Sequence, residues 1–175
     1  MPYLLGLLAL AGAVYFWMVR ARNAADMAGE MADMAGDVMA AARRFGFRRK
    51  TNIHPVDAVE DPRLAIAGAG VAFLEIGALP SEEQYRELAR SLETRFTMTT
   101  GEADEALIMG RWLSQQSNGG APAFTRLLKR LRNLQGGEGF DPLMAVLRDA
   151  ATAAGTLSPL QKDALEEVKI AFRLR

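Results

Sequence analysis

The strongest constraint on this chain is an uncharged, mostly apolar run, Met1–Val19, which Arg20 and Arg22 follow at once. As a helix, Tyr3–Val19 would be about 25 Å long, at the short end of what crosses the hydrocarbon core of a bilayer. Backbone groups in lipid must bond to one another, so a single spanning segment has to be helical. Residues 1–22 are therefore predicted to form a transmembrane anchor.

A cleaved secretion signal is the alternative to an anchor. Such a signal places positive charge before its apolar core and small residues at its cleavage site. Here the apolar run starts almost at Met1, and the aromatic residues Tyr15–Trp17 stand where cleavage would occur. Aromatic rings beside arginines are typical of a membrane interface. The pattern favours an uncleaved anchor.

Positive charge near the anchor follows the apolar run and does not precede it. The residues concerned are Arg20, Arg22, Arg43, Arg44, Arg48, Arg49 and Lys50. Because Lys and Arg prefer the cytoplasmic side, the N-terminus is expected outside and the rest of the chain in the cytoplasm. The absence of cysteine from the sequence agrees with a reducing compartment. A formal net charge of zero argues against a nucleic-acid-binding protein.

Residues 23–46 are predicted to form an amphipathic juxtamembrane helix, because they contain no proline and many alanines and methionines. An apolar stripe comprises Met27, Met31, Met34 and Val38, and an acidic stripe comprises Asp26, Glu30, Asp33 and Asp37. The apolar stripe is a candidate docking surface for a partner helix, since methionine adapts to irregular surfaces. Contact with the chain's own domain or with lipid headgroups is the open alternative.

Residues 47–60 are predicted to be a linker, with scattered charges and His54-Pro55 in the middle. His54 is the only histidine of the chain. It has no cluster of further ligands beside it, so we do not expect it to bind a metal.

From Asp61 to Arg175 the sequence predicts an all-α bundle. The same helix–turn–helix unit occurs twice. Asp61-Pro62 and Asp141-Pro142 each supply an expected N-cap followed by proline at the first helical position. Each first helix is expected to end at a glycine, Gly77 or Gly155.

Each unit then opens a second helix. Ser81 with Gln84 forms an expected capping box, and Ser158 caps the corresponding helix before Pro159. The expected inward faces are Tyr85, Leu88, Leu92 and Phe96 in the first unit and Leu160, Ala164, Leu165, Val168 and Phe172 in the second. Two more helices are predicted between the units, one over Glu102–Gln116 and one after Pro122.

The sequence contains no recognisable catalytic constellation. Its Gly-rich turns lack the Lys and Ser/Thr of a phosphate-binding loop, and no histidine accompanies a nucleophile. We therefore expect neither an enzyme nor a cofactor nor a small-molecule substrate. The helix after Pro122 carries a basic face, made of Arg126, Lys129, Arg130 and Arg132. Arg126 and Arg130 are candidate contacts for acidic lipid or a protein partner, and a solvated surface is the alternative.

The two turns carry short matching motifs. The first keeps Gly77, Leu79 and Glu83, with Ile76 before the glycine; the second keeps Gly155, Leu157 and Ser158, with Ala154 and Gln161 in the remaining places. This pattern resembles the TerB-like family, which includes tellurite-resistance TerB proteins and the central domain of DjlA-type membrane-anchored co-chaperones. The resemblance implies an all-helical interaction module.

The resemblance also implies something about metal. In the family, acidic residues of these motifs are associated with metal binding, and hard cations need several converging oxygen ligands. Of the four acidic positions only Glu83 is retained, so the sequence predicts no metal site. His54-Pro55-Val56 differs from the His-Pro-Asp of a J-domain, which leaves a co-chaperone role without support.

Together these features predict a non-enzymatic, membrane-anchored TerB-like scaffold in the bacterial inner membrane, with its bundle in the cytoplasm. Its expected partners are the lipid bilayer and membrane proteins, and one form of this role is an accessory subunit of a larger respiratory or photosynthetic complex. The alternative is a tellurite or metal stress-response protein.

Overall fold

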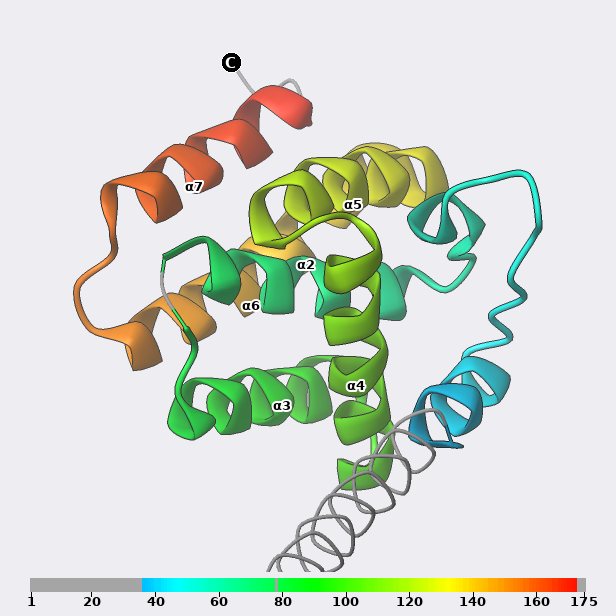
Figure 1. Cartoon of the computed structure of the whole chain (residues 1–175). Coiled ribbons are helices and arrows are strands. Elements are labelled where there is room, and N and C mark those ends of the chain that lie inside the picture. The colour runs from blue at the N-terminus through cyan, green and yellow to red at the C-terminus, as the bar shows by residue number, and fades with distance from the viewer. Residues whose placement is uncertain (1–35, 78, 173–175) are drawn as a thin grey trace, which may run out of the picture. The chain divides into compact units, whose positions relative to one another are not determined.

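The computed structural model describes residues 36–77 and 79–172 of the chain (Figure 1). These residues form helices and connecting loops without a strand, which confirms the all-α class for this part of the chain. After a helical stretch at residues 36–44, the elements are η1 (Pro55–Ala58), α2 (Pro62–Gly77), α3 (Glu82–Phe96), α4 (Thr100–Gln116), α5 (Gly120–Gln135), η2 (Gly136–Gly139), α6 (Phe140–Ala154) and α7 (Pro159–Ala171).

The chain divides after Asp37 into two compact units, and the second, Val38–Arg175, contains all the elements from η1 to α7. None of the helices within 36–77 and 79–172 is both long and apolar enough to cross a bilayer. The predicted anchor, residues 1–22, and the methionines Met27, Met31 and Met34 lie outside the described residues.

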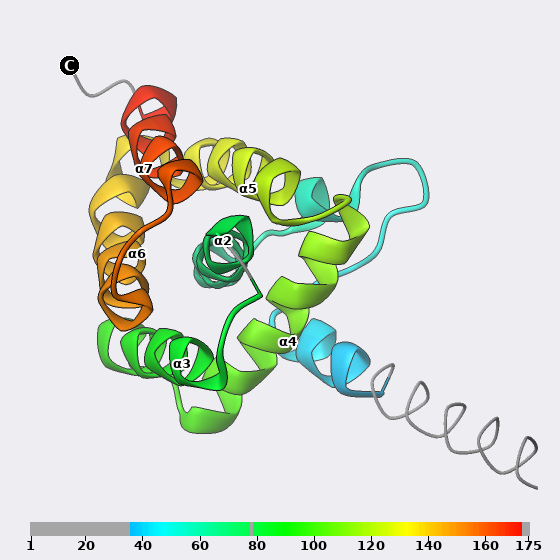
Figure 2. The same cartoon turned by 60° about the vertical axis from the view of Figure 1, so that its left-hand side comes forward.

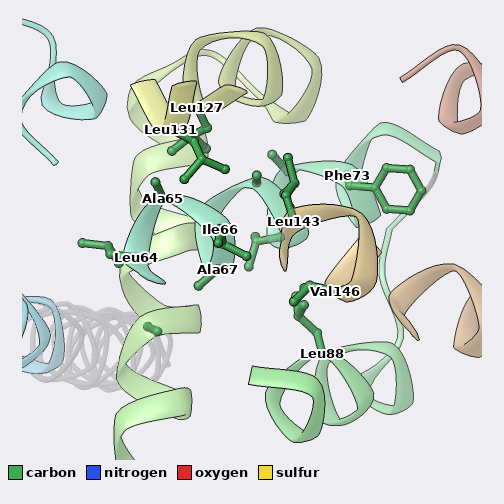
Figure 3. Packing of buried hydrophobic residues seen from close by; sticks show 14 of the residues in the cluster. Leu64, Ala65, Ile66, Ala67, Phe73, Leu88, Leu127, Leu131, Leu143 and Val146 are labelled. Atoms are coloured by element: carbon green, nitrogen blue, oxygen red, sulfur yellow. The ribbon is translucent and has the colours of Figure 1, made fainter. Parts of the chain in front are cut away.

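Helix α2 is the centre of the bundle. Figure 2 looks close to its axis and shows α3, α4, α5, α6 and α7 arranged around it. An unbroken run of α2, Leu64–Leu74, is buried. A helix that is apolar on every side belongs in a core. Side chains of α3, α5 and α6 surround it, among them Leu88, Leu127, Leu131, Leu143 and Val146 (Figure 3).

Small residues let α2 and α4 approach closely. A Cβ placed on Gly110 of α4 would lie 3.1 Å from the Cα of Gly68 and 3.0 Å from a methyl carbon of Val71. The chain uses glycine at this crossing because a larger side chain would push the two backbones apart.

The predicted N-caps have different outcomes. Asp61 caps α2, since its Oδ1 accepts a hydrogen bond from the backbone N–H of Arg63 at 2.8 Å. The expectation that Asp141 caps α6 is wrong, because α6 begins at Phe140 with Gly139 as its N-cap residue. The 3-10 turn η2 runs directly into α6, so Asp141 already lies inside the first helical turn.

The inward faces of α3 and α7 also differ in one respect from the sequence pattern. Leu88 and Leu92 of α3 and Val168 of α7 are buried as expected. Leu160, expected on the apolar face of α7, is 61% exposed. In this first turn it is the next residue, Gln161, that faces the bundle and is 4% exposed.

The segment predicted as a linker contains packed residues. Val56 and Val59 are fully buried, and His54 caps η1 by accepting a hydrogen bond at Nδ1 from the backbone N–H of Val56 at 3.3 Å. The Nε2 atom of His54 lies 3.1 Å from the carbonyl oxygen of Gln116, the last residue of α4. Because Nδ1 accepts, Nε2 carries the proton and donates, which ties this segment to α4.

Residues just before that segment and at its start dock on the bundle as well. Ala41 and Phe45 are buried, and Arg44 forms an ion pair with Glu105 of α4. The rings of Phe47 and Trp112 are nearly perpendicular, with their centroids 5.7 Å apart. Val38 is partly buried against the core. Val38 is the one residue of the apolar stripe that lies within the described part of the chain, and it contacts the chain's own domain.

Candidate functional site

The two glycine turns meet in space. Gln161, at the start of α7, is 4% exposed, and its Nε2 donates a hydrogen bond to the carbonyl oxygen of Phe73 in α2 at 3.3 Å. The end of this side chain occupies the space beside Gly77, where an added Cβ would lie 2.6 Å from the amide carbon. A hollow of about 300 Å³ lies between the turns, with Leu74, Gln84 and Leu157 among the residues around it.

Both turns end in a capping box. The Ser81 hydroxyl accepts from the backbone N–H of Gln84 at 3.3 Å, and Gln84 Oε1 accepts from the Ser81 N–H at 2.7 Å. Ser158 and Gln161 repeat this exchange at 3.2 and 3.1 Å. Gln84 and Gln161 therefore hold equivalent places in the two units.

The positions of Gln84 and Gln161 can be compared with the acidic residues that the TerB-like motif associates with metal binding. The motif aligns Glu83 with the family's glutamate, but the structure gives that capping position to Gln84, and Glu83 is exposed. Within 36–77 and 79–172, no group of three or more Asp, Glu or His residues lies close enough together to hold a metal ion. The Oε1 atoms of Gln84 and Gln161 each accept a hydrogen bond from a serine backbone N–H, and neither side chain carries a charge.

A larger hollow lies between α3 and α4. This α3–α4 groove is open to solvent and has a volume of about 740 Å³. Ala89, Leu107 and Ile108 form an apolar floor, and the charged residues around it are Glu82, Arg86, Arg90, Glu93, Asp104 and Arg111. An apolar floor with a charged rim is the ordinary form of a surface that receives a segment of another protein.

A stacked pair of residues lines the groove. The guanidinium carbon of Arg111 lies 4.0 Å from the centroid of the Tyr85 ring, a cation–π contact between α4 and α3. Burial raises the pKa of the Tyr85 hydroxyl, and the nearby carboxylate of Glu75 acts in the same direction, while Arg111 opposes them. Glu75 in turn accepts a hydrogen bond from the buried hydroxyl of Ser114. Tyr85 and Arg111 both line the groove.

The predicted basic face of α5 is largely engaged within the domain. Arg126 pairs with Asp57 at 3.3 Å, and Arg130 Nε donates to the carbonyl oxygen of Val59 at 2.6 Å. Arg132 donates to the carbonyl oxygen of Ala171 at 2.6 Å. These arginines hold η1 and the end of α7 against α5. The structure does not bring Arg126 or Arg130 to the α3–α4 groove.

Sequence reasoning did not single out the α3–α4 groove. In the sequence, the groove corresponds to a row of charged and small residues whose spacing places them on one face of α3. These residues are Glu82, Arg86, Ala89, Arg90 and Glu93. Such a row has the same pattern as a solvated surface. Only the crossing of α4 shows that it borders a hollow.

Comparison of the chain with protein-family models, with curated proteins and with solved structures gives no match.

Proposed function

We propose that this protein is a non-enzymatic, membrane-anchored interaction domain of the TerB-like kind, and that it receives partners in the α3–α4 groove. The observation that carries the proposal is the groove itself, a hollow of about 740 Å³ with an apolar floor and a charged rim. Its walls are two regular helices that pack on the buried α2, so the surface is pre-formed. Pre-formed surfaces lose little freedom on binding, which favours specific association.

The mode of attachment supports the same role. The apolar run and the arginines after it support an N-terminal anchor with the domain on the cytoplasmic side of the bacterial inner membrane. Ala41 and Phe45, which precede the segment predicted as a linker, and Phe47, its first residue, pack onto the domain. The chain leading from the anchor would therefore reach a folded surface at about Val38, not after a free tether.

A purification experiment tests this function. The full-length protein, tagged at its C-terminus, is extracted from membranes with mild detergent, and the copurifying proteins are identified by mass spectrometry. Ile108→Glu places a charge on the groove floor, and Leu160→Glu, at an exposed leucine of α7, is the matched control. We expect the first variant to lose the partners and the second to retain them.

Two results would overturn the proposal. One is a protein that fractionates with soluble proteins or whose C-terminal reporter is active only outside the cytoplasm. The other is an identical set of partners with both variants. Copurification of respiratory or photosynthetic subunits would identify the accessory-subunit form of the role.

A further inference from the structure

The charges around the α3–α4 groove are separated along its length. Glu93 lies near the end of α3 and Asp104 near the start of α4, on either side of the short connection between these helices. Arg86 lies in the first half of α3 and Arg111 in the second half of α4. Arg111 stacks on Tyr85, the residue before Arg86, so the first half of α3 and the second half of α4 lie side by side at the other end of the groove.

The groove therefore has an acidic end, with Glu93 and Asp104, and an arginine end, with Arg86 and Arg111. Glu82 also borders the arginine end and offsets part of its charge. Arg90, between the ends, donates to Glu87 of its own helix at 2.5 Å. Among the described residues, no ion pair involves Arg86, Glu93, Asp104 or Arg111, and Arg111 is stacked on Tyr85.

A surface with this distribution is complementary to itself. Rotation by a two-fold axis through the middle of the groove brings the arginine end of one copy opposite the acidic end of the other, at both ends at once. We propose that the occupant of the α3–α4 groove is a second copy of this chain, with Arg86 and Arg111 of each copy facing Glu93 and Asp104 of the other. This inference rests on the proposed function and names its partner.

The apolar floor and the arginine side chains fit such a contact. Ile108 is only partly buried in the single chain and would be covered by the second copy. Arginines are long enough to reach into an open hollow and pair with carboxylates, and their stems cover apolar surface. The sequence of the predicted anchor contains Ala9 and Ala13, a spacing that lets membrane helices pack closely, which is compatible with two copies in one bilayer.

Disulfide cross-linking tests the proposed pairing, because the chain contains no cysteine of its own. Full-length Arg86→Cys and Glu93→Cys variants with different tags are coexpressed, and membranes are oxidised mildly, because the two-fold places α3 of one copy opposite α3 of the other. A two-fold contact predicts a disulfide between the two differently tagged chains, with little product from either variant alone. Arg148→Cys, at an exposed arginine of α6, replaces Arg86→Cys in the control and should give no product with Glu93→Cys.

Charge reversal provides a second measurement that does not depend on cross-linking geometry. Arg86→Glu with Arg111→Glu should weaken self-association of the full-length protein in detergent by about tenfold or more, because like charges then face each other. Adding Glu93→Arg and Asp104→Arg restores complementarity and should restore the dimer. Arg148→Glu should leave it unchanged. Thermal unfolding of each variant verifies that the bundle is folded.

The outcomes separate this inference from the proposed function. A monomeric full-length protein, or cross-links from Arg148→Cys equal to those from Arg86→Cys, overturns the second copy as occupant. If in that case Ile108→Glu still removes copurifying proteins, the groove binds a different protein and the proposed function stands. If the dimer forms as described but no variant changes any further partner, the self-association stands alone.

Discussion

The buried amide of Gln161 takes the place that a side chain at Gly77 would occupy. An added Cβ at position 77 would lie 2.6 to 2.8 Å from the amide carbon, nitrogen and oxygen of Gln161. The amide is held on two sides, by the Ser158 N–H and by the carbonyl oxygen of Phe73. This contact joins the two helix–turn–helix units, because Gly77 ends the first helix of one and Gln161 belongs to the second helix of the other.

Gly77→Ala should destabilise the domain by about 1–3 kcal/mol, since the new methyl group must displace an amide that has little room to move. The measurement is the free energy of unfolding from urea titration. Gln161→Ala removes both the obstacle and the amide hydrogen bonds. The double variant should therefore lose less stability than the two single losses added together. Strict additivity would contradict the contact.

Gly120 is another glycine with no room for a side chain. A Cβ there would lie 2.6 Å from the carbonyl oxygen of Ala72 and 2.9 Å from the Cβ of Glu75, both on the central helix α2. Backbone cannot move aside as a side chain can, so Gly120→Ala should cost about 1–3 kcal/mol or more.

Gly101 provides the matched control for this prediction. It lies in the first turn of α4 with open space around it. Gly101→Ala should leave stability unchanged or raise it by up to about 1 kcal/mol, because alanine loses less backbone freedom in a helix. Equal losses from Gly120→Ala and Gly101→Ala, compared by thermal unfolding, would refute the close approach of α5 to α2.

Asp149 links α6 to α3 and makes stability depend on pH. Its Oδ2 accepts hydrogen bonds from Arg95 Nε at 2.8 Å and from the Ser91 hydroxyl at 2.6 Å. Arg95 is the main reason, and Ser91 a further one, that the pKa of Asp149 is lowered, while burial opposes them. A carboxylate with a lowered folded-state pKa stabilises the fold above its unfolded pKa of about 3.9. That stabilisation is lost as the pH falls through the pKa of Asp149 in the folded state.

The expected result is a loss of stability on acidification below about pH 4 that is smaller in Asp149→Asn than in the parent chain. At pH 7 the same variant should be less stable by about 1–2 kcal/mol, because it loses charge-assisted hydrogen bonds. Asp163→Asn, at an exposed aspartate of α7, is the control and should follow the parent curve. Coinciding curves for all three proteins in denaturant titrations from pH 7 to pH 2.5 would contradict this assignment.

Docking of residues 38–47 depends on Phe45. Its ring is 6% exposed and lies under the guanidinium of Arg63, 5.8 Å from the centroid. Phe45→Ala should cost about 3 kcal/mol for this packing. It should also speed trypsin cleavage after Arg48, Arg49 and Lys50.

Met39, 64% exposed in the same helical stretch, is the control position, and Met39→Ala should be cleaved at the parent rate. Cleavage is followed by mass spectrometry over time. If Phe45→Ala does not change the rate, the segment is not held by this ring.

Much of the local structure follows from sequence pattern. Ser81 with Gln84 is a capping box in the sequence and in the structure, because its hydrogen bonds involve residues three apart. The helices around Leu88, Leu127 and Val168 follow from the spacing of apolar residues. These features depend on near neighbours, which a single sequence displays.

Features that depend on distant segments could not be predicted in this way. The sequence does not show that Gln161 is buried against α2, since the same residue in a capping box is usually exposed. Nor does it show that Arg130 bonds a backbone carbonyl at Val59, since an arginine opposite a leucine stripe also suits solvent. Val56 and Val59 are buried in a segment whose charges and proline are typical of a linker. In each case the deciding partner is more than fifty residues away or belongs to an element with no periodic pattern.

The most direct test of the central claim is photo-cross-linking in intact membranes. A photoreactive phenylalanine derivative replaces Ile108 on the floor of the α3–α4 groove or, as a control, the exposed Lys162 of α7. If the groove is the contact surface of a membrane-held domain, irradiation gives a discrete higher-mass adduct in the membrane fraction from position 108 and none from position 162. No adduct at position 108, or equal adducts at both positions, would contradict the account.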